Sequence, residues 1–144
     1  MANWNERFVV LAQHVATWSK DSTKVGAIIA DEDNRVVSMG YNGLPSGCND
    51  STPERLERPM KYMYFEHAER NAIFNAARTG SKTLGCTMYM DWFPCADCAR
   101  GIIQSGLKRL VCSRPNFNDE RWGESFKASY EMMDEANVEI VFHS

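Results

Sequence analysis

The sequence has no long hydrophobic run and no excess of positive charge. No apolar stretch approaches the roughly 20 residues that a transmembrane helix needs, so a membrane role has no support. The formal net charge is −3, and an acidic chain provides no field that would attract a long polyanion. We therefore expect neither a membrane nor a nucleic-acid polymer as a partner, although one or two local arginines suffice to hold a small phosphorylated ligand.

The sequence also lacks a secretory signal peptide, a low-complexity tract and an even number of cysteines. Nothing at the N-terminus resembles the charged, apolar and small-residue segments of a signal peptide. Five cysteines are an odd number for a disulfide framework. We expect a reduced, cytoplasmic protein, and 144 residues suit a single domain over 1–144.

Hydrophobic periodicity and turn residues predict an alternation of helices and strands. Trp4, Phe8, Leu11, Val15 and Trp18 recur at helical spacing and predict one stripe of a first helix. We expect further helices over 67–79 and 95–105 and one carrying Trp122, Phe126, Tyr130 and Met133, with strands over 25–30, 35–41, 86–91, 108–113 and 138–142. This order predicts an α/β fold in which helices cover both faces of a mixed sheet.

A connection from Asn42 to Glu66 is longer than most loops in compact domains, and long ordered loops are usually functional. Its far end, residues 60–65, is strongly aromatic. This end is interpreted either as a wall of a ligand pocket or as a packed hydrophobic patch, because aromatic side chains favour both.

Cys95 and Cys98 are three residues apart at a predicted helix start, so both sulfurs project from one face and can share a metal ion. The positive end of the helix dipole favours the thiolate form that zinc requires. Taken alone, the pair is also compatible with a redox site or half of a structural zinc site. Without a thioredoxin-like context, we favour the metal.

His67 and Glu69 open another predicted helix. One imidazole and two thiolates make three protein ligands, the number typical of a catalytic zinc whose fourth position is open to water, whereas a structural site needs a fourth ligand. Zinc lowers the pKa of bound water to about 7, and Glu69 is the candidate proton carrier. The alternative is that Glu69 only stabilises a helix N-terminus through the macrodipole.

The combination of His67-Ala68-Glu69 with Pro94-Cys95-Ala96-Asp97-Cys98 matches the H-x-E and P-C-x-x-C signature of zinc-dependent deaminases. From about Lys24 to Val111 the chain resembles the deoxycytidylate (dCMP) deaminase family. The segments that carry this resemblance are Gly40-Tyr41-Asn42-Gly43-Leu44-Pro45-Ser46-Gly47, His67-Ala68-Glu69-Arg70-Asn71-Ala72-Ile73 and Phe93-Pro94-Cys95-Ala96-Asp97-Cys98.

The resemblance implies a cytidine deaminase-like three-layer α/β/α fold with a five-stranded mixed sheet and both zinc helices on one side. It implies that His67, Cys95 and Cys98 hold one catalytic zinc ion per chain and that Glu69 moves protons during deamination of dCMP. It also implies that Asn42 contacts the substrate sugar or base. The alternative for Asn42 is a turn residue before glycine.

The resemblance further implies a homo-oligomer, often a hexamer, with dCTP and dTTP as effectors. Some family members bind a second, structural zinc, but here Cys48 has no histidine beside it, so one zinc is expected. Beyond Val111 the likeness fades. Arg114 follows a predicted strand and is our candidate for the phosphate contact, because ligands gather at strand ends in such sheets, while a solvated loop arginine is the alternative.

Two other functions remain open at this point. One is deamination of another small base, nucleoside or nucleotide, such as cytidine, dCTP or a guanine-like purine, by the same zinc chemistry. The other is a non-catalytic module in which zinc only ties two helices together. An editor of tRNA or single strands fits less well, because such proteins usually have a basic surface.

Overall fold

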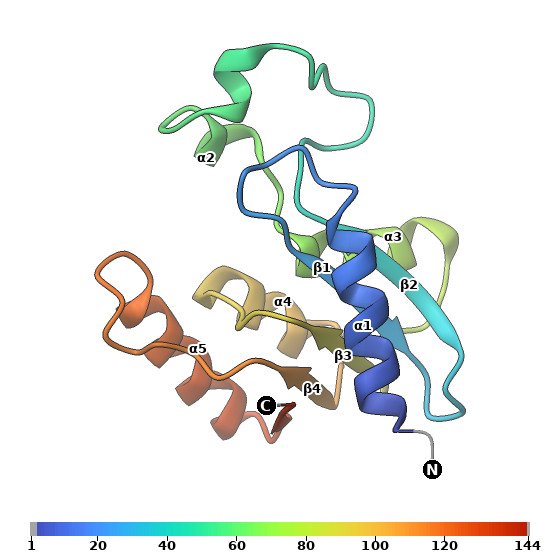
Figure 1. The fold of residues 1–144 in the computed structure, drawn as a ribbon. Helices are drawn as coiled ribbons and strands as arrows, with labels where there is room; N and C mark the ends of the chain where they lie inside the picture. The colour runs from blue at the N-terminus through green and yellow to red at the C-terminus, as the bar shows by residue number, and fades with distance from the viewer. Residues whose placement is uncertain (1–2, 144) are drawn as a thin grey trace.

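A five-stranded sheet with the order β2-β1-β3-β4-β5 lies at the centre of the computed structural model, which describes residues 3–143 (Figure 1). The strands are β1 (Gly26–Ala30), β2 (Val36–Tyr41), β3 (Thr87–Met90), β4 (Arg109–Cys112) and β5 (Glu139–Phe142). The helices are α1 (Trp4–Ala16), the 3₁₀ helix η1 (Pro53–Leu56), α2 (Lys61–Tyr64), α3 (Ala68–Thr79), α4 (Ala96–Gln104) and α5 (Gly123–Glu135). None of these helices has the length and apolar character needed to cross a membrane.

The sheet is mixed, as the alternation of elements predicts. Strand β1 pairs antiparallel with both β2 and β3, so that Ile28 lies opposite Met39 on one side and Tyr89 on the other. Strands β3, β4 and β5 are parallel to one another, because α4 and α5 carry the chain back between them. The β1–β2 connection turns tightly at Asn34, which has a positive φ of 61°.

Helices cover both faces of the sheet and make three layers. Helix α1 packs Phe8, Ala12 and Val15 against one face, on a cluster that includes Ile28 and Tyr89. Helices α3, α4 and α5 pack small and aliphatic side chains against the other face. The expected α/β/α architecture is therefore confirmed, and both helices that carry the cysteine and histidine motifs lie on the same side of the sheet (Figure 1).

The first helix differs in detail from its sequence prediction. It ends at Ala16, and both Trp4 and Trp18 are exposed rather than part of the buried stripe. Trp4 is the first residue of the helix and Trp18 lies beyond its last residue, whereas the buried Phe8, Ala12 and Val15 lie between them.

The long connection between β2 and α3 forms an excursion from the body of the protein, which we call the 43–66 excursion. It contains η1 and α2, and a bridge between Gly43 and Glu66 closes its base. In Figure 1 it rises above the sheet. Of the two interpretations of its aromatic end, the structure favours the pocket wall, because Tyr62 and Phe65 line a cavity whereas Met63 faces solvent and is not packed.

We expect Gly40→Ala to destabilise the fold, because an added Cβ would lie 2.4 Å from the Ala72 amide nitrogen and 2.7 Å from the Ala68 carbonyl oxygen. Overpacking against a backbone that cannot move aside should cost about 3 kcal/mol of unfolding free energy. Gly43→Ala is the matched control, since nothing lies within 4 Å of its Cβ position. Thermal melting of both variants checks this. Equal melting temperatures would show that β2 and α3 are not held this close.

Candidate active site and metal centre

Three metal-ligating side chains converge where α3 and α4 begin. His67 Nδ1 lies 3.5 Å from Cys95 Sγ and 3.3 Å from Cys98 Sγ, and all three donor atoms lie within 4.8 Å of one another. A tetrahedral zinc ion with Zn–S of about 2.3 Å and Zn–N of about 2.0 Å would separate nitrogen and sulfur donors by about 3.5 Å. Both the spacing and the chemistry of the donors therefore fit zinc.

Two of the three donors stand at helix N-cap positions. His67 is the N-cap of α3 and Cys95 that of α4, each with an extended backbone and neither making a side-chain hydrogen bond to its own helix. Both side chains are thus free to face the metal position. Ser125 caps α4 instead, because its Oγ accepts a 2.8 Å hydrogen bond from the Ala96 amide.

Arg70 connects the first turns of these two helices. Its Nε lies 2.8 Å from Glu66 Oε1 and its Nη1 lies 3.8 Å from Asp97 Oδ2. The guanidinium is three-quarters shielded from solvent, so the pairs add to the apolar packing between α3 and α4.

Without a metal, the two thiols and the imidazole compete for protons. The hydrogen bond from the Cys98 thiol, together with the His67 ring, lowers the pKa of Cys95 to about 4. The same hydrogen bond and burial raise the pKa of Cys98, and the hydrogen bond with Cys95 raises that of His67. Metal binding at such a site displaces protons, because zinc requires thiolates and neutral imidazole.

Glu69 follows His67 by two residues, in the first turn of α3, and is only 4% exposed. Burial raises the pKa of its carboxyl above the usual range. A carboxyl that holds its proton more readily than one in water suits a group that must both take up and release protons.

His67, Glu69 and Cys95 open onto one cavity of about 650 Å³, and the fully buried Cys98 lies behind them. Much of its wall is aromatic, formed by Phe65, Trp92, Phe93, Trp122 and Phe126, and its polar lining includes Asn42, His67, Glu69 and Cys95. The Trp122 ring meets the His67 ring edge to face with centroids 6.3 Å apart. A large cavity with apolar walls and a few convergent polar groups is the usual form of a small-molecule site.

Asn42 lines the same cavity and is 8% exposed. The segment just before β1 holds its side chain. Oδ1 accepts a hydrogen bond from the Val25 amide, and Nδ2 donates one to the Thr23 carbonyl. The structure thus brings five of the six sequence-predicted site residues together: His67, Glu69, Cys95, Cys98 and Asn42.

Arg114 is not brought to the cavity. Its exposed guanidinium lies over the Phe142 ring, 4.8 Å from the centroid. The cationic side chains that line the cavity are Arg58, Lys61 and Arg121.

Sequence reasoning missed these cations. Arg121 stands in the same segment as Arg114, but the β4–α5 connection carries the chain onward to the cavity before α5 begins. A signal was present in Asp119, whose Oδ1 accepts the amides of Arg121 and Trp122 in an Asx-type turn. Arg58 and Lys61 lie in the 43–66 excursion, where no pattern marks them.

A cytidine deaminase-like fold with a His-Cys-Cys cluster and a buried glutamate beside it defines a class of zinc-dependent deaminase. A sequence profile of the cytidine and deoxycytidylate deaminase zinc-binding region matches residues 2–114. The chain therefore belongs to the cytidine and deoxycytidylate deaminase family.

Individual relatives agree with this assignment. The chain is 41% identical to an uncharacterized deaminase in the luxG 3′ region of Aliivibrio fischeri, over 99% of this chain and 95% of that protein. It is 42% identical to human deoxycytidylate deaminase, over 81% of this chain and 67% of that protein. The dCMP deaminase of cyanophage S-TIM5, solved with dCMP and dUMP, shares the fold with a TM-score of 0.75 at 23% identity, over 95% and 94% of the two chains.

Replacing Cys95 or Cys98 by Ala should release zinc and lower the melting temperature, because a site built from two helix starts couples metal binding to packing. Cys48→Ala is the matched control, since this thiol is exposed and remote from the donor group. Metal analysis and thermal melting of the three variants check this. One tightly held zinc and an unchanged melting temperature in both the Cys95 and the Cys98 variant would show that these cysteines are not ligands.

Proposed function

We propose that a single domain over residues 1–144 catalyses the hydrolytic deamination of dCMP to dUMP and ammonia. The observation that carries this proposal is the convergence of three zinc donors and the buried Glu69 on one cavity that also has cationic side chains in its wall. The choice of dCMP as the substrate is supported by two relatives named deoxycytidylate deaminase, at 37 and 42% identity.

A zinc ion held by His67, Cys95 and Cys98 would polarise water so that a nucleophile is available at neutral pH. Adding the hydroxyl group to C4 of cytosine requires a proton at N3, and expelling ammonia requires a second proton at the amine. Glu69 is buried and lines the cavity two residues from His67. We assign it both transfers: it would carry the first proton from water to N3 and the second from the new C4 hydroxyl group to the leaving amine.

Asn42 is assigned to the substrate sugar or base. Both of its amide hydrogens are already used within the protein, by the Thr23 carbonyl and the Asp21 carboxylate. What remains open is a lone pair on Oδ1, so the group that Asn42 recognises must be a donor. A sugar hydroxyl meets this requirement.

The 5′-phosphate is assigned to Arg121, with Arg58 beside it in the cavity lining. Guanidinium groups pair with phosphate through two parallel hydrogen bonds. Lys61 is the third cation, but both of its hydrogen bonds go to the Asp21 carboxylate, so its charge is already balanced. The exposed Arg114 is the less favourable assignment, because its guanidinium faces Phe142.

Three broader features belong to the same proposal. The five cysteines are all free, which is in keeping with a reducing, cytoplasmic location. Homo-oligomer formation and control by dCTP and dTTP rest on the family resemblance. Size-exclusion chromatography with light scattering, with and without these nucleotides, measures both.

We expect Glu69→Gln to keep zinc and fold but to lower kcat by about 10²–10⁴-fold, because it removes the proton carrier and leaves the three ligands. Glu131→Gln, on an exposed face of α5, is the control for loss of a carboxylate. Ammonia release and zinc content are measured for both. Near-normal turnover in the Glu69 variant would rule out this mechanism.

Arg121→Ala should lower kcat/KM for dCMP by roughly 10–100-fold, the effect of losing about 1.5–3 kcal/mol in a charged hydrogen bond. Turnover of deoxycytidine, which has no phosphate, should barely change. Arg114→Ala is the matched control and should leave both substrates unaffected. A loss on dCMP in the Arg114 variant and none in the Arg121 variant would reverse the assignment, and an equal loss on both substrates would remove Arg121 from phosphate binding.

A further inference from the structure

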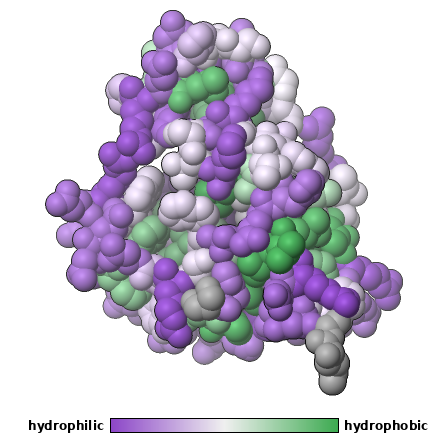
Figure 2. Space-filling view, viewed as in Figure 1, coloured by the Kyte–Doolittle hydropathy of each residue, from purple (hydrophilic) through white to green (hydrophobic). Residues whose placement is uncertain are grey.

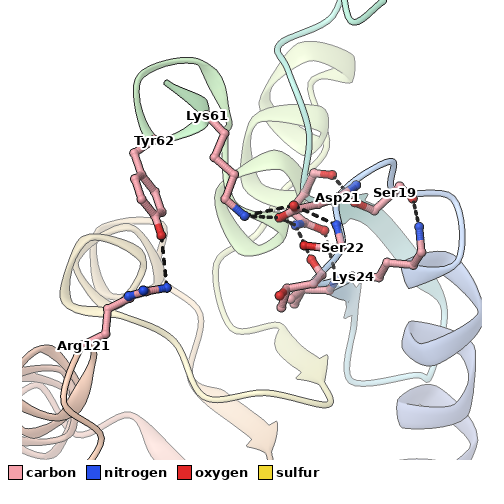
Figure 3. Close-up of polar contacts among 10 residues, drawn as sticks. Ser19, Asp21, Ser22, Lys24, Lys61, Tyr62 and Arg121 are labelled. Carbon is pink, nitrogen blue, oxygen red and sulfur yellow. Dashed lines mark hydrogen bonds and ion pairs between the residues drawn. The ribbon is translucent and has the colours of Figure 1, made fainter. Parts of the chain in front are cut away.

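A buried ion pair joins the 43–66 excursion to the body of the protein. Lys61 Nζ donates to both carboxylate oxygens of Asp21, at 3.0 and 3.3 Å, and the two side chains are only 8% and 7% exposed (Figure 3). The partners are 40 residues apart in the sequence. Burying two charges costs desolvation free energy, which is offset only when the charges pair closely and further hydrogen bonds satisfy their remaining donors and acceptors. The Ser22 amide supplies one such bond to Asp21.

The excursion depends on this pair because it contributes almost no apolar packing. From Gly43 to Glu66, Lys61 is the only buried side chain. The surface of this part of the molecule is mostly hydrophilic (Figure 2). Its other polar ties to the body include the bridge and the Arg70–Glu66 ion pair at its base, the exposed Lys20–Asp50 pair, and a 3.3 Å contact between the Tyr62 hydroxyl and Arg121.

Asp21 also touches the cavity-lining amide of Asn42. Asn42 Nδ2 donates to Asp21 Oδ2 at 3.2 Å and to the Thr23 carbonyl at 2.8 Å, while Oδ1 accepts from the Val25 amide at 2.9 Å. Asp21 is therefore held by Lys61 on one side and holds Asn42 on the other. The carboxylate fills the last donor site of the amide.

We propose that Lys61 and Asp21 form a positioning pair that fixes the Asn42 amide, so that Asn42 presents only an acceptor to the substrate sugar. This proposal rests on the proposed deaminase function and adds a selection rule to it: the site favours nucleotides whose sugar donates a hydroxyl hydrogen. Without Lys61, the carboxylate of Asp21 would be a buried charge with no counter-charge and would take up a proton or move. In either case the second amide hydrogen of Asn42 loses its fixed acceptor.

The test compares dCMP with 2′,3′-dideoxycytidine 5′-monophosphate, which lacks the hydroxyl. Lys61→Met alone leaves Asp21 unpaired and risks unfolding, so the decisive variant is the double replacement Lys61→Met with Asp21→Leu, since apolar substitutes for both members of a buried pair are often tolerated. Lys24→Met is the matched control. Its ammonium lies in the same network but donates to the Ser19 carbonyl and not to Asp21 (Figure 3).

We expect the wild-type and Lys24→Met proteins to favour dCMP by about tenfold or more in kcat/KM, chiefly through KM. In the double variant this preference should fall to within about threefold, with kcat on the dideoxy nucleotide little changed. A merely structural role would lower activity on both nucleotides alike. Equal activity of the wild type on both nucleotides, or an undiminished preference in the double variant, would overturn the proposal.

A second readout needs no activity. The side-chain amide signals of Asn42 in a ¹H–¹⁵N spectrum, assigned by their loss in Asn42→Ser, should shift and exchange faster with solvent in the double variant and stay in place in Lys24→Met. Unmoved Asn42 signals in the double variant would overturn the positioning role. A wild-type protein inactive on both nucleotides would contradict the proposed function, and the Asn42 signals would then decide the positioning role by themselves.

Discussion

The whole site depends on two helices beginning at the same place. His67 and Cys95 can meet only because α3 and α4 lie on one face of the sheet with their N-termini adjacent. Small residues make this possible. Gly40 lets α3 approach β2 until backbones nearly touch, and Ala68, Ala72 and Ala99 fill the layer without pushing the helices apart. Two helix dipoles then point their positive ends at the position where thiolates must form.

Polar groups around this point have divided roles. The N-cap side chains are the proposed metal donors, and neighbouring residues satisfy or connect the helix ends in their place. Ser125 accepts a hydrogen bond from the first amide of α4, and Arg70 links Glu66, just before α3, to Asp97 in the first turn of α4. The metal centre is therefore also a packing centre, and removing the metal should loosen α3 and α4 together.

Much of this was predictable from sequence because the signals are local. Alternating periodicity predicted the order of elements, and H-x-E with P-C-x-x-C predicted the donor cluster that the structure brings together. The exposure of Trp4 and Trp18 was not predictable, since helical spacing alone does not tell which ends of the stripe reach beyond the packed part of the helix. The Lys61–Asp21 pair and the cavity position of Arg121 join segments far apart in the chain, and no spacing rule reaches that far.

The net charge of the chain also failed to predict the charges that line the cavity. A formal charge of −3 argued against a polymeric nucleic acid, yet the cavity gathers Arg58, Lys61 and Arg121 in its wall. The ion pair with Asp21 balances one of these charges, which leaves two arginines for an anion. The wall also includes Glu69, Asp119 and Glu120, so a small phosphorylated ligand would be recognised by the two guanidinium groups themselves and not by a net positive charge of the cavity.

We propose that this cavity deaminates a cytosine nucleotide and that the phosphate contributes to recognition. Ammonia release by the zinc-loaded protein, measured across dCMP, deoxycytidine, cytidine, dCTP and guanine, tests both points. We expect kcat/KM for dCMP to exceed that for each of the others. Preference for a nucleoside or for guanine would contradict the substrate, and ammonia release from none of the five would contradict a catalytic role for the zinc site.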